Sequence, residues 1–100
     1  MKYYSVLDVT PTTQNWIAAY LPTANQLVTK HGGQYIARTQ THEQLEGEAQ
    51  PVGLRIIIEW TSKEGAQAFM NDETYAQHLK NRTAGSISHH YLIAGQDDFA

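Results

Sequence analysis

The chain has 100 residues, 41% of them hydrophobic and 17% charged, which is typical of a single globular domain over residues 1–100. Seven Lys and Arg against ten Asp and Glu leave a formal charge of −3. That charge argues against a nucleic-acid partner, because phosphates are neutralised by clustered cations. The absence of cysteine excludes disulfides, thiolate nucleophiles and zinc–sulfur sites.

The N-terminal residues show no targeting signal. Asp8 interrupts the short apolar run that begins at Tyr3, so no signal peptide is expected. No stretch approaches the ~20 apolar residues that span a bilayer. We therefore expect a cytoplasmic protein without a membrane partner.

The first half of the chain predicts a strand, a helix and a second strand. Residues 2–9 are rich in Tyr, Val and Leu and stop before a proline, as a strand does. From about 13 to 31, apolar residues recur at the spacing of one helix face, and Pro22 inside this pattern predicts a bend. Gly32 and its glycine neighbour end the helix, and residues 34–41 form the next strand.

The second half predicts a strand, two short helices and a last strand. Residues 54–61 are the most strand-like segment of the chain, and a polar connection precedes them. Ser62 and Asp72 are expected to cap two short helices, since their side-chain oxygens accept hydrogen bonds from first-turn amides. Residues 87–94 form the last strand, and 95–100 form a polar tail.

This order of elements predicts a ferredoxin-like α+β fold: a βαββαβ sandwich with a four-stranded antiparallel sheet and its helices on one face. The strands carry apolar residues on both faces; in the third strand, Ile56 and Ile58 oppose Ile57. Because the helices cover one face only, a second copy of the chain is the expected cover for the other. The pattern does not decide which parity of the third strand faces the partner.

Several motifs follow one another in a distinctive order. They are Gly32-Gly33-Gln34-Tyr35-Ile36-Ala37-Arg38, Leu45-Glu46-Gly47, Ile57-Ile58-Glu59-Trp60 with Ser62, and Tyr75 with Arg82. Together they resemble the uncharacterised family called domain of unknown function 1330, over nearly the whole chain. The resemblance implies the dimeric α+β barrel superfamily, in which two ferredoxin-like sheets close a barrel. Phe69-Met70 and His89-His90 depart from the family pattern.

Arg38 and Glu59 stand out because both lie within strands that are otherwise built for burial. With the connecting turn centred between Glu48 and Ala49, the two charges face each other across the sheet. Such a pair serves either as a clamp for a substrate carboxylate or as a structural ion pair that fixes strand register.

Three further residues are candidates for ligand binding. Glu46, in the polar connection, is either a proton acceptor over a pocket mouth or a solvated loop acid. Tyr75 and Arg82 are seven residues apart and share a helix face. They hold an anionic or enol-like group together, or else Tyr75 packs on the sheet and Arg82 caps the helix end.

The five histidines do not suggest a metal site. His89 and His90 are neighbours on a strand and point to opposite faces, and the other three lack ligand spacing. We expect no metal and no cofactor. One of this pair faces the interior, either as a hydrogen-bonded core residue or as a general base.

Five aromatic residues of the helices and the third strand have two interpretations. They form a flat cleft for a planar ligand, or they are simply core. The residues are Trp16, Tyr20, Trp60, Phe69 and Tyr75.

The function that these patterns favour is a small homodimer that binds a small organic ligand in a pocket of the barrel. The first alternative, implied by the superfamily, is a cofactor-independent enzyme, similar to a monooxygenase, isomerase or dehydratase, acting on a small aromatic or keto–enol substrate. Its candidate catalytic residues are Arg38, Glu59, His89 and His90. The second alternative is a non-catalytic structural or regulatory subunit without a pocket.

Overall fold

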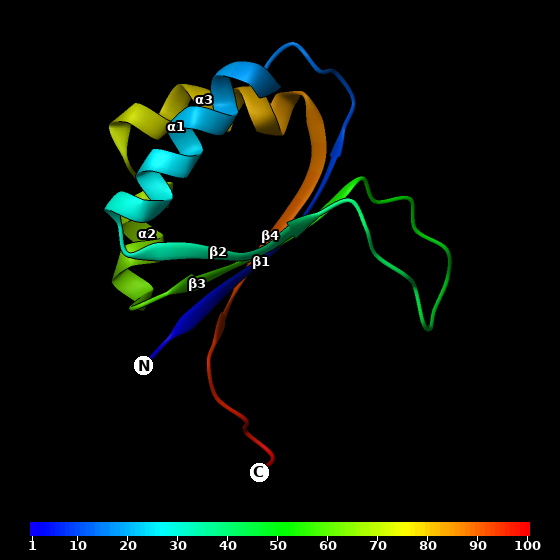
Figure 1. Ribbon diagram of the computed structural model, residues 1–100, viewed down its shortest axis with the longest axis vertical. Coiled ribbons are helices and arrows are strands. Elements are labelled where there is room, and N and C mark those ends of the chain that lie inside the picture. Colours follow the sequence, from blue (N-terminus) through cyan, green and yellow to red (C-terminus); the bar gives the residue numbers. More distant parts are fainter.

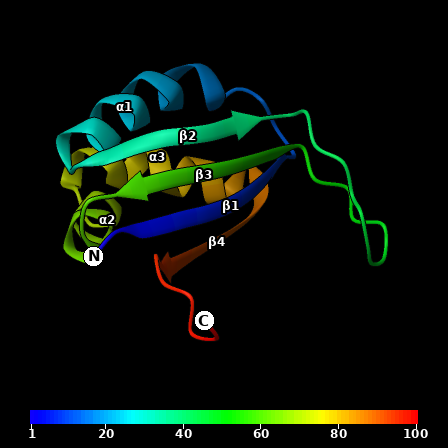
Figure 2. The same ribbon diagram turned by 60° about the horizontal axis from the view of Figure 1, so that its bottom comes forward.

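The computed structural model describes all 100 residues and has seven regular elements. They are β1 (Tyr3–Pro11), α1 (Ile17–Lys30), β2 (Gly33–Thr39), β3 (Leu54–Trp60), α2 (Lys63–Met70), α3 (Glu73–Ala84) and β4 (Ser86–Ala94). The strands form one antiparallel sheet in the order β2-β3-β1-β4. All three helices lie on the same side of that sheet (Figure 1; Figure 2). The predicted ferredoxin-like α+β arrangement is therefore confirmed.

The starts of the two later helices follow from their capping residues. The Ser62 hydroxyl accepts a hydrogen bond from the Gly65 amide (3.1 Å) at the start of α2. The Asp72 carboxylate accepts one from the Thr74 amide (2.8 Å) at the start of α3. Both caps satisfy amides that a helix start leaves unpaired, as the sequence predicts. None of the helices has the length and hydrophobicity needed to cross a membrane.

Helix α1 begins at Ile17, later than the predicted start near residue 13. The cause is a contact with the distant end of α3: the Thr12 and Thr13 amides both donate to the Gly85 carbonyl (2.8 and 3.2 Å). The Trp16 indole nitrogen also donates to that carbonyl (3.1 Å). Position 85 needs glycine, because a Cβ there would collide with the Trp16 indole. Pro22 lies inside α1, and the bend at this residue stays a prediction.

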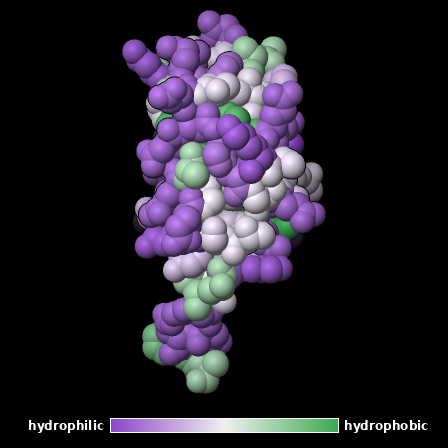
Figure 3. Space-filling model, turned by 90° about the vertical axis from the view of Figure 1, so that its left-hand side faces the viewer, coloured by the Kyte–Doolittle hydropathy of each residue, from purple (hydrophilic) through white to green (hydrophobic).

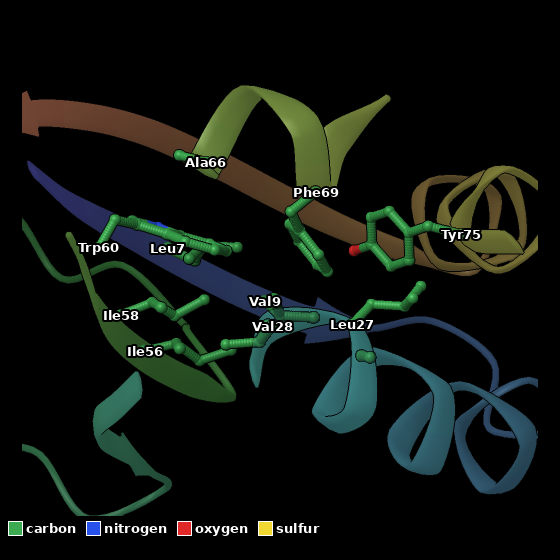
Figure 4. Close-up of a cluster of buried hydrophobic side chains, with 11 residues drawn as sticks. Leu7, Val9, Leu27, Val28, Ile56, Ile58, Trp60, Ala66, Phe69 and Tyr75 are labelled. Atoms are coloured by element: carbon green, nitrogen blue, oxygen red, sulfur yellow. The ribbon is translucent and has the colours of Figure 1, made fainter. Parts of the chain in front are cut away.

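The hydrophobic core fills the layer between the sheet and the helices (Figure 4). Ile56, Ile58 and Trp60 point from β3 toward the helices, so this is the parity of β3 that faces inward. The buried apolar residues are Leu7, Val9, Ala24, Leu27, Val28, Ile56, Ile58, Trp60, Ala66, Phe69 and Tyr75.

The opposite face of the sheet carries apolar side chains with no cover. On β4, Ile87, Tyr91 and Ile93 are 60%, 68% and 49% exposed. Val6 and Ile57 lie opposite each other on β1 and β3 at the middle of this face, and both are exposed. On the side where α2 and the N-terminus lie, by contrast, hydrophilic and neutral residues dominate the surface, with only small hydrophobic spots (Figure 3). The prediction of apolar residues on both sheet faces is confirmed.

A buried polar cluster joins three strands inside the core. Ser5 on β1 is fully buried, and its hydroxyl oxygen lies 2.8 Å from the Trp60 indole nitrogen and 2.7 Å from His90 Nε2. The indole N–H can only donate, so it occupies one lone pair of the serine oxygen. The same hydroxyl shares a second hydrogen bond with His90 Nε2, in which the tautomer of the imidazole decides which group donates.

We predict that Ser5→Ala lowers the free energy of unfolding by about 1–3 kcal/mol, because the buried Trp60 indole and the half-buried His90 imidazole lose their partner. Urea denaturation at pH 7 and fixed protein concentration measures this change. Ser88→Ala is the matched control: Ser88 is a half-buried strand serine that lies opposite Val9, and its loss should change stability by under ~0.5 kcal/mol. Equal effects of the two substitutions would contradict the role assigned to Ser5.

Candidate functional site

A pocket of about 610 Å³ lies between the sheet and the helices α1 and α3. Its floor is apolar and comes from β1 and β3, with Leu7, Val9, Ile56 and Ile58. Tyr20 and other residues of α1 line it from the helix side. The volume falls in the range of sites for small organic ligands, which are mostly apolar with a few polar groups.

An uninterrupted row of aromatic rings runs from the pocket into the core. Ring-centre distances are 5.4 Å from Trp16 to Tyr20, 5.8 Å from Tyr20 to Tyr75, and 4.3 Å from Tyr75 to Phe69. The row ends at Trp60, 5.5 Å from Phe69 and buried away from the pocket. The same rings are pocket wall at one end and core at the other, and binding of a planar ligand between them stays a prediction.

The phenol groups of Tyr20 and Tyr75 meet at the pocket wall, with their hydroxyl oxygens 2.5 Å apart. Burial, together with the neighbouring Tyr20, raises the pKa of Tyr75 above its ordinary value. The Tyr75 hydroxyl is therefore protonated near neutral pH and remains a hydrogen-bond donor.

Arg82 lies in the last turn of α3 and lines the same pocket. The residue is only 4% exposed, its Nε has no hydrogen-bond partner, and it takes part in none of the ion pairs. Its guanidinium carbon is 5.9 Å from the centre of the Tyr20 ring. The Arg82 side chain does not cap the end of α3. The Ser86 hydroxyl donates a hydrogen bond to the Arg82 backbone carbonyl there.

The two adjacent histidines of β4 face opposite ways, as expected for neighbours on a strand. His90 faces the helices and lines the pocket, with Nε2 bonded to Ser5. Burial and the nearby Arg82 guanidinium lower the pKa of His90 to about 4. His89 lies on the open face, where its Nδ1 is 2.8 Å from an Asp8 carboxylate oxygen.

Arg38 lies at an exposed edge of the pocket, on β2. Its guanidinium stacks over the Tyr35 ring, 3.8 Å from the ring centre, and donates to the Asn25 amide oxygen (2.6 Å). Burial raises the pKa of Tyr35, and the neighbouring Tyr20 adds to the shift.

The predicted pairing of Arg38 with Glu59 across the sheet is wrong. Arg38 lies opposite Ile56 and faces the helices, whereas Glu59 lies opposite Gln34 and faces away. The pairing fails because the register differs from the predicted one, with Gln34 opposite Glu59. The change of face has a second cause, a β-bulge between Tyr35 and Ala37. Regular alternation from Gln34 would place Arg38 on the side of Glu59, but the extra residue turns the rest of the strand over.

Glu59 belongs to the open face. Its carboxylate is 3.0 Å from the Lys2 ammonium and accepts a hydrogen bond from the Tyr4 hydroxyl (3.4 Å). Two candidate catalytic residues, Glu59 and His89, are therefore separated from the pocket by the sheet. They share no site with Arg38 and His90.

Glu46 is exposed in the connection between β2 and β3, outside the pocket lining. This connection, residues 40–53, projects from the body of the molecule (Figure 2). Its placement matches the interpretation of Glu46 as a solvated loop acid and gives it no contact with the other candidates.

Of the predicted site residues, the structure brings together Arg38, Tyr75, Arg82 and His90. Sequence reasoning missed Ser5, whose hydroxyl orients His90, and Tyr35, which supports Arg38. A serine within an otherwise apolar strand was the one available signal for the first. No group of three or more His, Cys, Asp or Glu side chains has the geometry of a metal site.

The structure resembles several solved proteins. An RPA0582 protein of unknown function from Rhodopseudomonas palustris has a TM-score of 0.78 and 17% identity, covering 96% of this chain and 83% of its own. SnoaB, a cofactor-independent oxygenase from Streptomyces nogalater, has a TM-score of 0.65 and 14% identity, covering 98% and 96%. A dimeric ferredoxin-like protein from an uncultured marine organism has a TM-score of 0.56 and 13% identity, covering 100% of both chains. A search among curated proteins finds no match to this sequence.

The fold and the pocket define the class: a ferredoxin-like α+β protein with a cavity between its sheet and its helices. The chain belongs to the family described as Domain of unknown function (DUF1330), whose model matches residues 2–96. The resemblance seen in the sequence motifs is confirmed.

We predict that His90 makes the protein less stable in acid. The unfolded chain binds a proton on this residue below pH 6.5, but the folded chain binds it only below about pH 4. The unfolded state therefore holds more protons in that window, and the free energy of unfolding falls as the pH drops from 6.5 to 4. After discounting for the exposed part of the ring, the loss is on the order of 2 kcal/mol.

Urea denaturation at several pH values measures how the free energy of unfolding changes with pH. His90→Gln should flatten the dependence of the unfolding free energy on pH between pH 6.5 and 4. Asp72 acts in a different window: its pKa is lowered to about 2, chiefly by the hydrogen bond with His31, so its contribution is lost only below about pH 3.8. A slope that survives in His90→Gln would contradict this assignment.

Proposed function

We propose that this protein binds a small, largely apolar organic molecule in the pocket between α1, α3 and the sheet. The observation that carries the proposal is the pocket itself, which combines a floor of aliphatic side chains with a wall of tyrosine and tryptophan rings. Flat aromatic walls favour planar ligands, since rings stack or meet edge to face. Among the polar groups that line it, Arg38, Tyr75, Arg82 and His90 serve to orient a ligand.

A second candidate is a cofactor-independent enzyme, and the likeness to the oxygenase SnoaB favours it. Such chemistry on a keto–enol substrate needs a donor that stabilises an oxyanion and a base that removes a proton. Arg82 and the tyrosine pair supply the first. Of the predicted bases, only His90 lines the pocket, since Glu46 and Glu59 lie elsewhere. The third interpretation, a regulatory subunit without a pocket, has no support from this geometry.

We further propose that the protein is a homodimer in which the open faces of two sheets pack together. The exposed apolar side chains of β1, β3 and β4 supply the contact, and a dimeric ferredoxin-like protein shares the fold. Burying such a face against a second copy removes apolar surface from water that the helices leave uncovered.

The pocket is tested with N-phenyl-1-naphthylamine, a neutral dye whose fluorescence rises in apolar sites. We expect saturable binding that is abolished by Leu21→Trp, because Leu21 lines the pocket and the larger ring fills it. Ala19→Trp is the matched control, since Ala19 is exposed on the same helix outside the lining. Absence of saturable binding, or equal loss in both variants, would contradict the proposed function.

The dimer is tested by light scattering at micromolar concentration, where we expect a mass twice the 11.3 kDa of one chain. Ile57→Glu places a charge at the middle of the open face. This variant should unfold or aggregate rather than give soluble monomers, because each half alone exposes too much apolar strand. Ala19→Glu, on the exposed side of α1, should remain dimeric. A stable wild-type monomer would refute the proposal.

A further inference from the structure

Arg82 is a buried cation with no counter-charge. A guanidinium stays protonated in proteins, so this residue cannot become neutral when it is removed from water. Burial of an unpaired charge costs several kcal/mol, and buried charges are therefore normally paired or hydrogen-bonded. Arg82 has neither kind of partner at Nε, and it is 4% exposed.

The rest of the pocket does nothing to neutralise that charge. Its lining contains two arginines and no Asp or Glu, in a chain whose formal charge is −3. The other arginine, Arg38, is bonded to the neutral Asn25 amide. All four ion pairs of the protein lie outside the lining: Lys2–Glu59, Lys30–Asp72, His31–Asp72 and His89–Asp8. Net positive charge is therefore concentrated in the pocket.

The neutral polar groups near Arg82 include a further donor. The Tyr20 and Tyr75 hydroxyls carry two hydrogens and use one of them in their mutual hydrogen bond, so one remains to donate. His90 Nε2 is engaged in the hydrogen bond with Ser5, so this nitrogen does not compensate the guanidinium. The groups around the guanidinium thus supply no counter-charge and offer a hydrogen-bond donor beside it.

We infer that the ligand of this pocket is an organic anion with an apolar body, such as an aromatic carboxylate, and that Arg82 binds its charged group. The inference rests on the proposed ligand-binding function and specifies the class of ligand. A carboxylate accepts two parallel hydrogen bonds from a guanidinium and supplies the missing counter-charge. The Tyr20–Tyr75 pair donates its free hydrogen to the same group or to a neighbouring oxygen.

Displacement of the bound neutral dye by two matched compounds tests this inference. 2-Naphthoate and 2-naphthamide share the same ring system and differ in charge. We expect 2-naphthoate to displace the dye at a concentration roughly 10- to 100-fold lower than 2-naphthamide, the range that a hydrogen-bonded charge supplies. Arg82→Met should remove this preference, measured as the ratio of the two displacing concentrations, which does not depend on the affinity for the dye.

Two controls separate a binding role of Arg82 from a structural one. Lys80→Met removes a charge from an exposed position of the same helix and should keep the preference for 2-naphthoate. The urea midpoint of Arg82→Met should equal or exceed that of the wild type, because an apolar side chain replaces an unpaired buried charge. Arg82→Lys keeps the charge without the planar fork and should retain only part of the preference.

The outcomes are distinguishable. Equal displacement by the two compounds in the wild type overturns the inference even if Arg82→Met fails to fold, and so does a preference that persists in a folded Arg82→Met. If the dye does not bind at all, the proposed function fails first. A preference for 2-naphthoate that is lost in Arg82→Met and kept in Lys80→Met establishes the anion site.

Discussion

Apolar residues on both faces of one sheet are the constraint on which the rest of this structure depends. Three helices cover one face, so the inward parity of β3 decides which side chains become core and which stay exposed. Ile56, Ile58 and Trp60 meet the helices, and Ile57 is left outside. The same parity fixes the cross-strand neighbours on β1 and β4, and so places His90 inside and His89 outside. The division between pocket and proposed dimer face follows from this one choice of face.

The layer between sheet and helices is not filled evenly. At the α2 end, the Trp60 indole is fully buried against Phe69 and hydrogen-bonded to Ser5, which closes that end. At the other end, the Gly85 carbonyl accepts hydrogen bonds from the Thr12 and Thr13 amides and from the Trp16 indole. Because of these hydrogen bonds, α1 begins only at Ile17, and Trp16 is held at the wall of the pocket. A core at one end and a cavity at the other thus share a single row of aromatic rings.

Local features of the sequence were predictable, and features set by distant partners were not. The Ser62 and Asp72 caps depend on amides two or three residues away, so composition and spacing suffice to find them. The start of α1 depends on Gly85, which no local pattern connects to Thr13. The bulge in β2 is a backbone feature with no residue signature in this chain, and it alone reverses the side on which Arg38 lies.

Of the candidate site residues, those on α3 were found together because helical spacing fixes their shared face without knowledge of the sheet. Tyr75 and Arg82 obey that rule, and both line the pocket. Strand residues depend instead on register, which the sequence leaves open when both faces are apolar. The pair that required cross-strand register, Arg38 with Glu59, is therefore the one that failed.

His90 and Arg82, two basic groups of the pocket lining, respond differently to burial, and this limits what the site can do. The His90 imidazole yields its proton, since burial and Arg82 both favour the neutral form, and its Nε2 is occupied by Ser5. A guanidinium, by contrast, is always charged in proteins. Arg82 can thus always stabilise a negative charge in this pocket. The base available to remove a proton, His90, is weak and already hydrogen-bonded. Such an arrangement suits a ligand that arrives already ionised, or a substrate acidic enough for its enolate to form with little help.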